Sequence, residues 1–194
     1  MSVDIQQSIL NKNRKDKFLL VLNLPPILKT ANDNTPGNRS INFLNLDSLQ
    51  YSIYGTVVPE TTIAEVDLPY SAQTAKFTSY TRAAYKSVTV NFTVDNQFNN
   101  WWVLWYWLNT INDSKESTYN FNQLASPDKF VNTNNYQTNI TVYGLDEYNN
   151  KKIQWDYIKA FITNLGEITY NYRDGEQIES SFTFAFNQLN TQLL

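Results

Sequence analysis

Apolar and polar residues alternate with a period of two along several stretches of the chain. The alternation is most regular in residues 87–94, where valine or phenylalanine occupies every second position. Successive side chains of a β-strand point to opposite faces of the sheet, so this pattern predicts a strand with one buried face. Strands are also predicted at residues 18–24, 49–54, 63–69, 138–143 and 152–162. The first of these is apolar on both faces, and Pro25 and Pro26 end it.

Two further segments have the pattern of β-hairpins. At the end of the chain, alternating residues 168–172 and 179–189 flank a turn over residues 173–175, Arg-Asp-Gly. An Asp-Gly pair in such a position is a strong hairpin signal. Residues 63–86 predict a long extended hairpin, because small and polar residues separate spaced aromatic residues and few could build a core of their own.

One segment has the periodicity of a helix. Asp95 is a typical N-cap residue and apolar residues follow it, so we expect a helix over residues 95–111. Its segment 101–108, WWVLWYWL, is apolar nearly all round, which means that both sides of the helix need partners. The residues expected to pack are Phe98, Trp101, Trp102, Trp105 and Leu108, with Leu104 beside them.

Together these segments predict a mainly β fold, an antiparallel β-sandwich or barrel with one prominent helix at about 95–111. Residues 1–16 are expected to form an N-terminal arm, and residues 17–194 a single domain. Residues 29–40 and 112–137 are loops by composition. A chain of 194 residues, 42% of them hydrophobic, is long enough to bury a core.

The composition removes most catalytic and metal-binding chemistry. The chain has no Cys and no His, which excludes disulfides, thiolate metal sites and the usual Ser-His and Cys-His arrangements. With five Gly, it has no glycine-rich phosphate loop. The acidic pairs lie in or beside predicted turns, where solvated carboxylates are ordinary: Glu65 with Asp67, Asp146 with Glu147, and Glu176 with Glu179. We therefore expect no enzyme, no metal and no cofactor.

The net charge of −3 argues against tight nucleic-acid binding, because proteins that bind nucleic acid tightly are normally basic. The basic residues near the N-terminus, Lys12, Arg14, Lys15 and Lys17, are typical of a solvated arm. No apolar run approaches the ~20 residues of a membrane-spanning helix, so we expect no membrane anchor.

The ordered pattern of residues 49–111 resembles the tube proteins of contractile phage tails of the T-even kind. A strand leads to a proline-containing turn, then to VDLPYSAQTAKF, to a hairpin that ends at Tyr85, to the strand VTVNFTVD and to a Trp-rich helix. The runs YIKAFITNLGEITYN and SSFTFAFNQL fit the second half of the family pattern. Two positions depart from it, since Lys159 or Ala160 replaces a glycine and Ile162 replaces a proline. The resemblance covers about residues 17–190.

This resemblance implies a subunit that forms hexameric rings, in which strands of neighbouring subunits join into one barrel around a channel. The rings stack into a conduit that double-stranded DNA passes through without specific binding. Other copies of the chain and other phage tail proteins are the implied partners, and the implied location is the virion tail, assembled in the host cytoplasm. Related tube proteins occur in type VI secretion systems.

Two sets of residues are expected to serve assembly. Small uncharged side chains suit a channel that must not hold DNA, whereas Lys and Arg would bind its phosphates. The predicted lumen-lining residues are Ser87, Thr89, Asn91, Thr93, Ser181, Thr183, Ala185 and Asn187; the alternative is the solvent face of an ordinary sandwich. The predicted contacts between subunits and rings are Tyr70, Phe77, Tyr80 and Tyr85; the alternative is that these aromatics belong to the subunit's own core.

Two other functions stay open on the sequence. A tail terminator, head-tail adaptor or tube-initiating ring would share the fold and differ in its ends and loops. A carbohydrate- or nucleic-acid-binding β module would instead use the Trp cluster for stacking.

Overall fold

The computed structural model describes residues 12–26, 28, 46–71, 73–111, 136–173 and 175–194. Most of the predicted arm, the loop at 29–40 and most of the loop at 112–137 lie outside these residues. The elements are β1 (Phe18–Leu22), α2 (Leu46–Ser52), β2 (Ile53–Gly55), β3 (Ile63–Tyr70), β4 (Gln73–Arg82), β5 (Val88–Thr93), α3 (Asn99–Ile111), β6 (Thr138–Leu145), β7 (Lys151–Leu165), β8 (Glu179–Ala185) and β9 (Gln188–Leu193).

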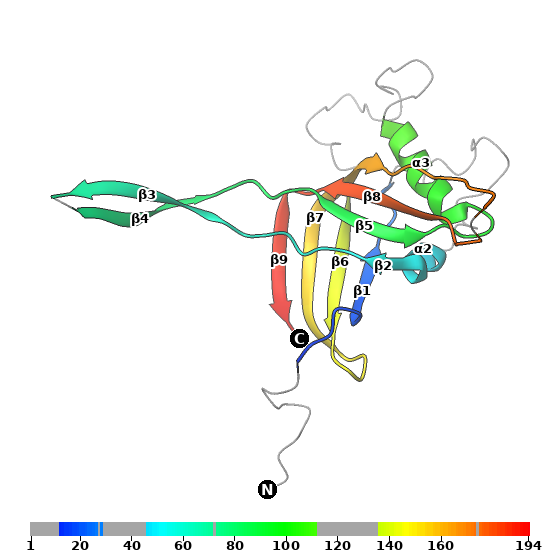
Figure 1. Ribbon diagram of the computed structural model, residues 1–194, viewed down its shortest axis with the longest axis horizontal. Helices are drawn as coiled ribbons and strands as arrows, with labels where there is room; N and C mark the ends of the chain where they lie inside the picture. The colour runs from blue at the N-terminus through cyan, green and yellow to red at the C-terminus, as the bar shows by residue number, and fades with distance from the viewer. Residues whose placement is uncertain (1–11, 27, 29–45, 72, 112–135, 174) are drawn as a thin grey trace, which may run out of the picture.

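The strands form a nearly closed, barrel-like antiparallel sheet, which confirms the predicted fold class. The order is β1-β6-β7-β8-β5-β2, and β9 pairs with β7 in addition. The long strand β7 belongs to two groups: its first part pairs with β6 and β9, and residues 161–165 pair with β8. The strands of the two groups run in different directions (Figure 1).

A β-bulge in β7 separates these two groups of strands. Between the pairs Thr138↔Ala160 and Ile140↔Tyr157, β7 has one residue more than β6. Lys159 lies in this extra stretch with φ of 56°, in the left-handed region that favours glycine. Its N–H donates to Asn139 Oδ1 over 3.2 Å, so the unpaired backbone donor of the bulge is satisfied.

The core lies between the two groups of strands and the helices. On β5 and β8, Val90 faces Phe182 and Val88 faces Phe184, and all four side chains are buried. Tyr157 of β7 is fully buried against Phe184, with ring centroids 5.2 Å apart. Burying side chains of this size contributes about 1.5–3 kcal/mol each, so these buried aromatic and aliphatic side chains supply much of the stability of the fold.

The predicted helix is confirmed as α3, which begins at Asn99. Asp95 caps it, because its carboxylate accepts hydrogen bonds from the backbone N–H groups of residues 97, 99 and 100. The residues that α3 buries are Asn100, Val103, Leu104, Tyr106, Trp107 and Thr110. The aromatic and leucine positions predicted to pack, Trp101, Trp102, Trp105 and Leu108, are partly buried against the core, and Phe98 precedes the helix.

The predicted strand at 49–54 is wrong. Residues 46–52 are helical (α2) and only residues 53–55 form a strand. A short apolar run does not distinguish a strand from a buried helical turn. Here contacts with the core decide: Leu49 is buried, and Ser52 Oγ accepts a hydrogen bond from Asn100 of α3.

The predicted hairpin at 168–172 and 179–189 is also wrong. Residues 166–173 and 175–178 form no strand, and β8 pairs with β7 on one edge and β5 on the other. β7 ends at Leu165, which pairs with Phe182, so residues 168–172 belong to the connection between β7 and β8 and form no strand of their own. The segment 179–189 is divided as well, because the chain turns at Phe186 and Asn187 and returns along β7 as β9.

Candidate functional site

The outward sides of β5 and β8 form one continuous polar surface, here called the β5–β8 face. Thr89 lies opposite Thr183 and Asn91 lies opposite Ser181, and the two threonine hydroxyls are 3.1 Å apart. Directly opposite residues of an antiparallel pair share a face. Because the alternate residues of both strands are buried in the core, these four point away from it.

The other predicted lumen positions lie at the margins of this face. Thr93 pairs with Glu179 at one end, and Ala185 pairs with Phe161 of β7 at the other. Ser87 is exposed directly before β5. Asn187 is exposed in the turn between β8 and β9, where its N–H donates to the carbonyl of Ile158.

Sequence reasoning missed three residues that extend the face. Thr163 and Asn164 of β7 are exposed beside β8, and Thr163 Oγ1 donates to the Thr183 carbonyl. Tyr54 of β2 donates its hydroxyl hydrogen to Glu179 over 2.9 Å. Partial desolvation and this hydrogen bond hold the pKa of Tyr54 above its usual value, so the phenol is neutral at physiological pH.

A second candidate surface is the hairpin arm, formed by β3 and β4, which projects from the rest of the protein (Figure 1). Its two faces differ in character. Glu65, Asp67 and Lys76 lie on one face, where Lys76 Nζ is 2.7 Å from Glu65 Oε1. The other face is mainly apolar, and it carries Val66, Leu68, Tyr70, Ala75 and Phe77, with Gln73 opposite Tyr70.

The apolar face of the hairpin arm is exposed. The exposed fractions are 75% for Tyr70 and 55% for Phe77, and Leu68 between them is 49% exposed. The sequence signal for this face was present in residues 63–69, where acidic and apolar residues alternate. Val66 and Leu68 extend this face beyond the aromatic residues that the sequence analysis predicted.

The other two predicted contact residues lie outside this apolar face. Tyr80 sits at an irregularity of β4, with φ of 59° and 90% of its surface exposed. Tyr85 is half-buried and packs against Phe186 of the same chain, with ring centroids 5.2 Å apart.

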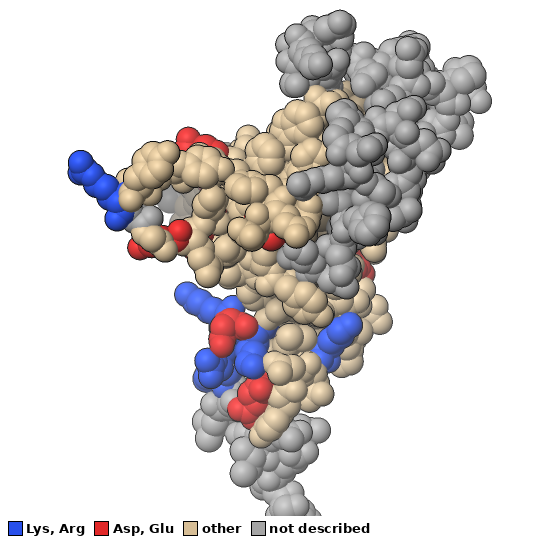
Figure 2. Space-filling model, turned by 90° about the vertical axis from the view of Figure 1, so that its right-hand side faces the viewer, with Lys and Arg blue, Asp and Glu red and all other residues tan. Residues whose placement is uncertain are grey.

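One end of the protein gathers basic side chains, as the lower part of Figure 2 shows. Lys12, Arg14 and Lys152 line a pocket of about 260 Å³ together with Asp146 and Glu147. Partial burial raises the pKa of Asp146, but hydrogen bonds from Asn150 and Tyr148 and the charge of Lys152 outweigh it and hold this pKa below its usual value.

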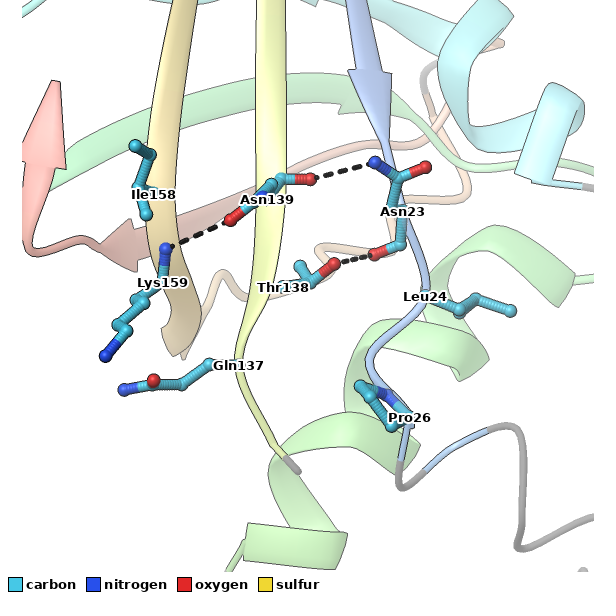
Figure 3. Close-up of a pocket in the computed structure, with 8 residues that line it drawn as sticks. All are labelled: Asn23, Leu24, Pro26, Gln137, Thr138, Asn139, Ile158 and Lys159. Atoms are coloured by element: carbon cyan, nitrogen blue, oxygen red, sulfur yellow. Dashed lines mark hydrogen bonds between the residues drawn. The ribbon is translucent and has the colours of Figure 1, made fainter. Parts of the chain in front are cut away.

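A larger pocket, of about 450 Å³, lies beside the β7 bulge (Figure 3). Asn139 links its walls: the side chain accepts from the N–H of Lys159, and the backbone carbonyl accepts from Asn23 Nδ2. Thr138 Oγ1 donates to the carbonyl of Asn23. Among its lining residues Lys159 alone carries an ionisable side chain, so they offer no acid–base pair.

Two kinds of feature are absent from the described residues. They contain no cluster of three or more His, Cys, Asp or Glu side chains arranged to hold a metal ion. They contain no helix with the length and apolar character that crossing a membrane requires.

Residues 13–192 match the protein family described as "Phage tail tube protein". No curated protein matches the sequence. The fold is similar to a chain in the structure of the anti-feeding prophage cap, described as its tube terminating cap, with a TM-score of 0.58, 11% identity and 100% of both chains covered.

Two chains from an extracellular contractile injection system, PVC, have a similar fold. One is in its sheath–tube complex in the extended state, with a TM-score of 0.58, 10% identity and 100% of both chains covered. The other is in its sheath/tube terminator, with a TM-score of 0.56, 10% identity and coverage of 95% of this chain and 99% of that one. At these identities the likeness concerns the fold.

Proposed function

The chain belongs to the phage tail tube protein family, and from this membership we propose that it is a non-catalytic subunit whose six-membered rings stack into a tube that conducts double-stranded DNA. The similar solved structures contain tube or terminator proteins of contractile injection systems. A structural role in a tail tube or its terminator follows from the family, whereas the number of subunits and the passage of DNA belong to the proposal.

The observation that supports the proposal is the β5–β8 face, which in this proposal lines the channel. Its central residues, Thr89, Asn91, Ser181 and Thr183, are uncharged. Glu179 at its margin is negative, and no Lys or Arg belongs to the predicted set. Phosphates bind to Lys and Arg through the release of counterions, so a face without them lets DNA slide.

The hairpin arm provides contacts to neighbouring copies through its apolar face. An isolated two-stranded hairpin is marginally stable in water, and this one exposes Leu68, Tyr70 and Phe77 on the same side. Interfaces between proteins are enriched in aromatic residues at their buried centres. Tyr80 adds a further exposed aromatic group at the base of the arm, whereas Tyr85 acts mainly within its own subunit.

A terminator or cap ring is the second candidate function. The chain resembles the anti-feeding prophage cap and the PVC sheath–tube complex equally well, with a TM-score of 0.58 for both. Fold similarity therefore does not separate a repeated tube subunit from a single capping ring.

Negative-stain electron microscopy of the purified full-length chain tests the proposal. Long tubes with six-fold cross-sections are the expected result. Single rings that do not stack would favour the terminator function. A chain that sediments as a monomer at high concentration and forms no rings would contradict both.

A further inference from the structure

The pocket beside the β7 bulge lies outside both the β5–β8 face and the hairpin arm. It is enclosed by the segment that follows β1, the start of β6 and the bulge itself, and its volume is about 450 Å³. Several of its polar groups already bond to one another. Asn23 and Asn139 are linked by a hydrogen bond, and Thr138 donates to the carbonyl of Asn23. These bonds fix the walls of the pocket in relation to each other.

Lys159, which lines this pocket, differs from the other basic residues of the strands. Every other Lys or Arg in a described strand has a side-chain partner within the chain. The partners are Glu65 for Lys76, Tyr85 for Arg82, the ring of Tyr143 for Lys151 and Asp146 for Lys152. The ammonium group of Lys159 forms no hydrogen bond or ion pair with any described residue. Its charge is therefore available to a group from outside the chain.

The backbone at Lys159 would be better served by another residue. Its φ of 56° lies in the left-handed region, which glycine adopts without steric cost. A glycine would keep the bulge and relieve the strain, but it would leave the lining of the pocket without a positive charge. Strained backbone of this kind gathers at functional sites, and bulges often redirect a side chain there. The lysine at this position thus indicates a use for its side chain.

The other lining residues indicate what the lysine would bind. The side-chain amide of Gln137 has one long hydrogen bond, 3.4 Å to the Tyr136 hydroxyl, and is a second available donor. In Figure 3 the Lys159 and Gln137 side chains extend on one side of the pocket, and Leu24 and Pro26 lie on the other. One positive charge and one neutral donor match a carboxylate, which has a single negative charge and two acceptor oxygens. Phosphate carries up to two negative charges, and DNA binding requires many Lys or Arg residues.

We propose that this pocket binds a carboxylate on an extended peptide segment of a separate protein. Lys159 and Gln137 hold the carboxylate, and the half-buried Leu24 and Ile158 contact an apolar side chain beside it. The carboxylate belongs to an acidic side chain or to a chain end, since both present the same two oxygens. This site goes beyond the proposed function, because it uses neither the channel face nor the hairpin arm and would serve a tube subunit and a terminator alike.

Saturation-transfer NMR on the full-length chain tests the site, because this method detects the small ligand whether the protein is assembled or not. The probes are the capped tripeptide Leu-Glu-Leu and its neutral counterpart Leu-Gln-Leu. The acidic peptide should bind roughly three- to tenfold more tightly, as expected for a partly exposed, hydrogen-bonded ion pair, and added salt should reduce the difference. Leu-Leu-Leu with a free carboxyl end shows whether a terminal carboxylate serves as well as a glutamate side chain.

Three variants separate the charge of Lys159 from the shape of the bulge. Lys159→Met keeps the length of the side chain and should abolish the preference for the acidic peptide. Lys159→Gly relaxes the backbone and should abolish it too. The matched control is Lys151→Met, on the same strand but outside the pocket, which should keep the preference. Circular dichroism verifies that all three variants are folded.

Four results would overturn the proposal. The first is equal binding of the acidic and neutral peptides by the wild-type chain, and the second is an unchanged preference in Lys159→Met or Lys159→Gly. The third is displacement of the acidic peptide by inorganic phosphate at a lower concentration than by acetate, which would show a phosphate site. The fourth is loss of ring formation in Lys159→Met, because the carboxylate would then belong to a second copy of this chain. Peptide binding does not depend on rings, so a wild-type chain that forms none would contradict only the proposed function.

Discussion

Replacing Tyr70 and Phe77 by Ser should abolish assembly and leave the subunit folded. The two side chains expose 75% and 55% of their surface, which together equals about 1.3 whole side chains available for burial in a contact. At about 1.5–3 kcal/mol for a fully buried side chain, their loss weakens each contact by about 2–4 kcal/mol. This raises the dissociation constant of each contact roughly 30- to 700-fold.

Sedimentation velocity measures the assembly, and circular dichroism with thermal melting measures the fold. The matched control is Thr74→Ala with Thr78→Ala, two changes on the opposite face of the same arm, which should assemble normally. Tubes formed by the Tyr70 and Phe77 variant at wild-type concentration would refute the reasoning. Loss of the folded signal together with assembly would show that the two aromatics belong to the subunit's own core.

Four further predictions concern the subunit and the channel. Phe184→Ala should lower the free energy of unfolding in urea by about 3–5 kcal/mol, because the ring is fully buried, whereas Thr183→Ala next to it should change this value by less than about 1 kcal/mol. Lys159→Gly should raise the unfolding free energy by about 1 kcal/mol, because glycine adopts the left-handed backbone without steric strain; an unchanged or lower value would show that the bulge is unstrained. Because the pKa of Asp146 is lowered in the folded state, its carboxylate stabilises the fold at pH values above about 3.9, the pKa of an unfolded aspartate. This contribution is lost as the pH falls through the folded pKa. Asp146→Asn should therefore make the urea midpoint of unfolding vary less with pH in the acid range. Asn91→Lys with Thr183→Lys should leave rings intact in micrographs but slow DNA ejection from virions, and unaltered ejection would contradict a lumenal position.

The strands that the sequence predicted best are those with one buried face. The alternation in residues 87–94 correctly indicated which side of β5 enters the core, since burial on one side is itself the cause of the pattern. The same holds for residues 179–185, where phenylalanine alternates with small residues. The exposed face of the pair followed directly, although its position in an assembly stays a proposal.

The errors arose where contacts distant in sequence decide the local structure. Leu49 reaches the core from a helix, and a six-residue window contains no sign of that contact. The Asp-Gly pair at 174–175 lies in the sequence between β7 and β8, which do pair, but the alternation in residues 168–172 does not reveal that β7 ends at Leu165. Which residues of β3 and β4 share a face depends on the pairing of Val66 with Phe77. This pairing does not follow from a simple count along the two strands, because the register shifts between Ile63 and Glu65.

The bulge at Lys159 has a consequence for the mechanics of the proposed tube. It divides β7 between two groups of strands that run in different directions, and in the proposed tube both would belong to the same wall. A sheet resists stretching along its strands, which are covalent, more than separation across them, which breaks hydrogen bonds. In the proposed tube, two groups of strands with different directions would leave no single line along which the wall splits under bending or internal pressure. In such a tube, one residue with an unusual backbone angle, Lys159, would allow a thin protein wall to be strong in more than one direction.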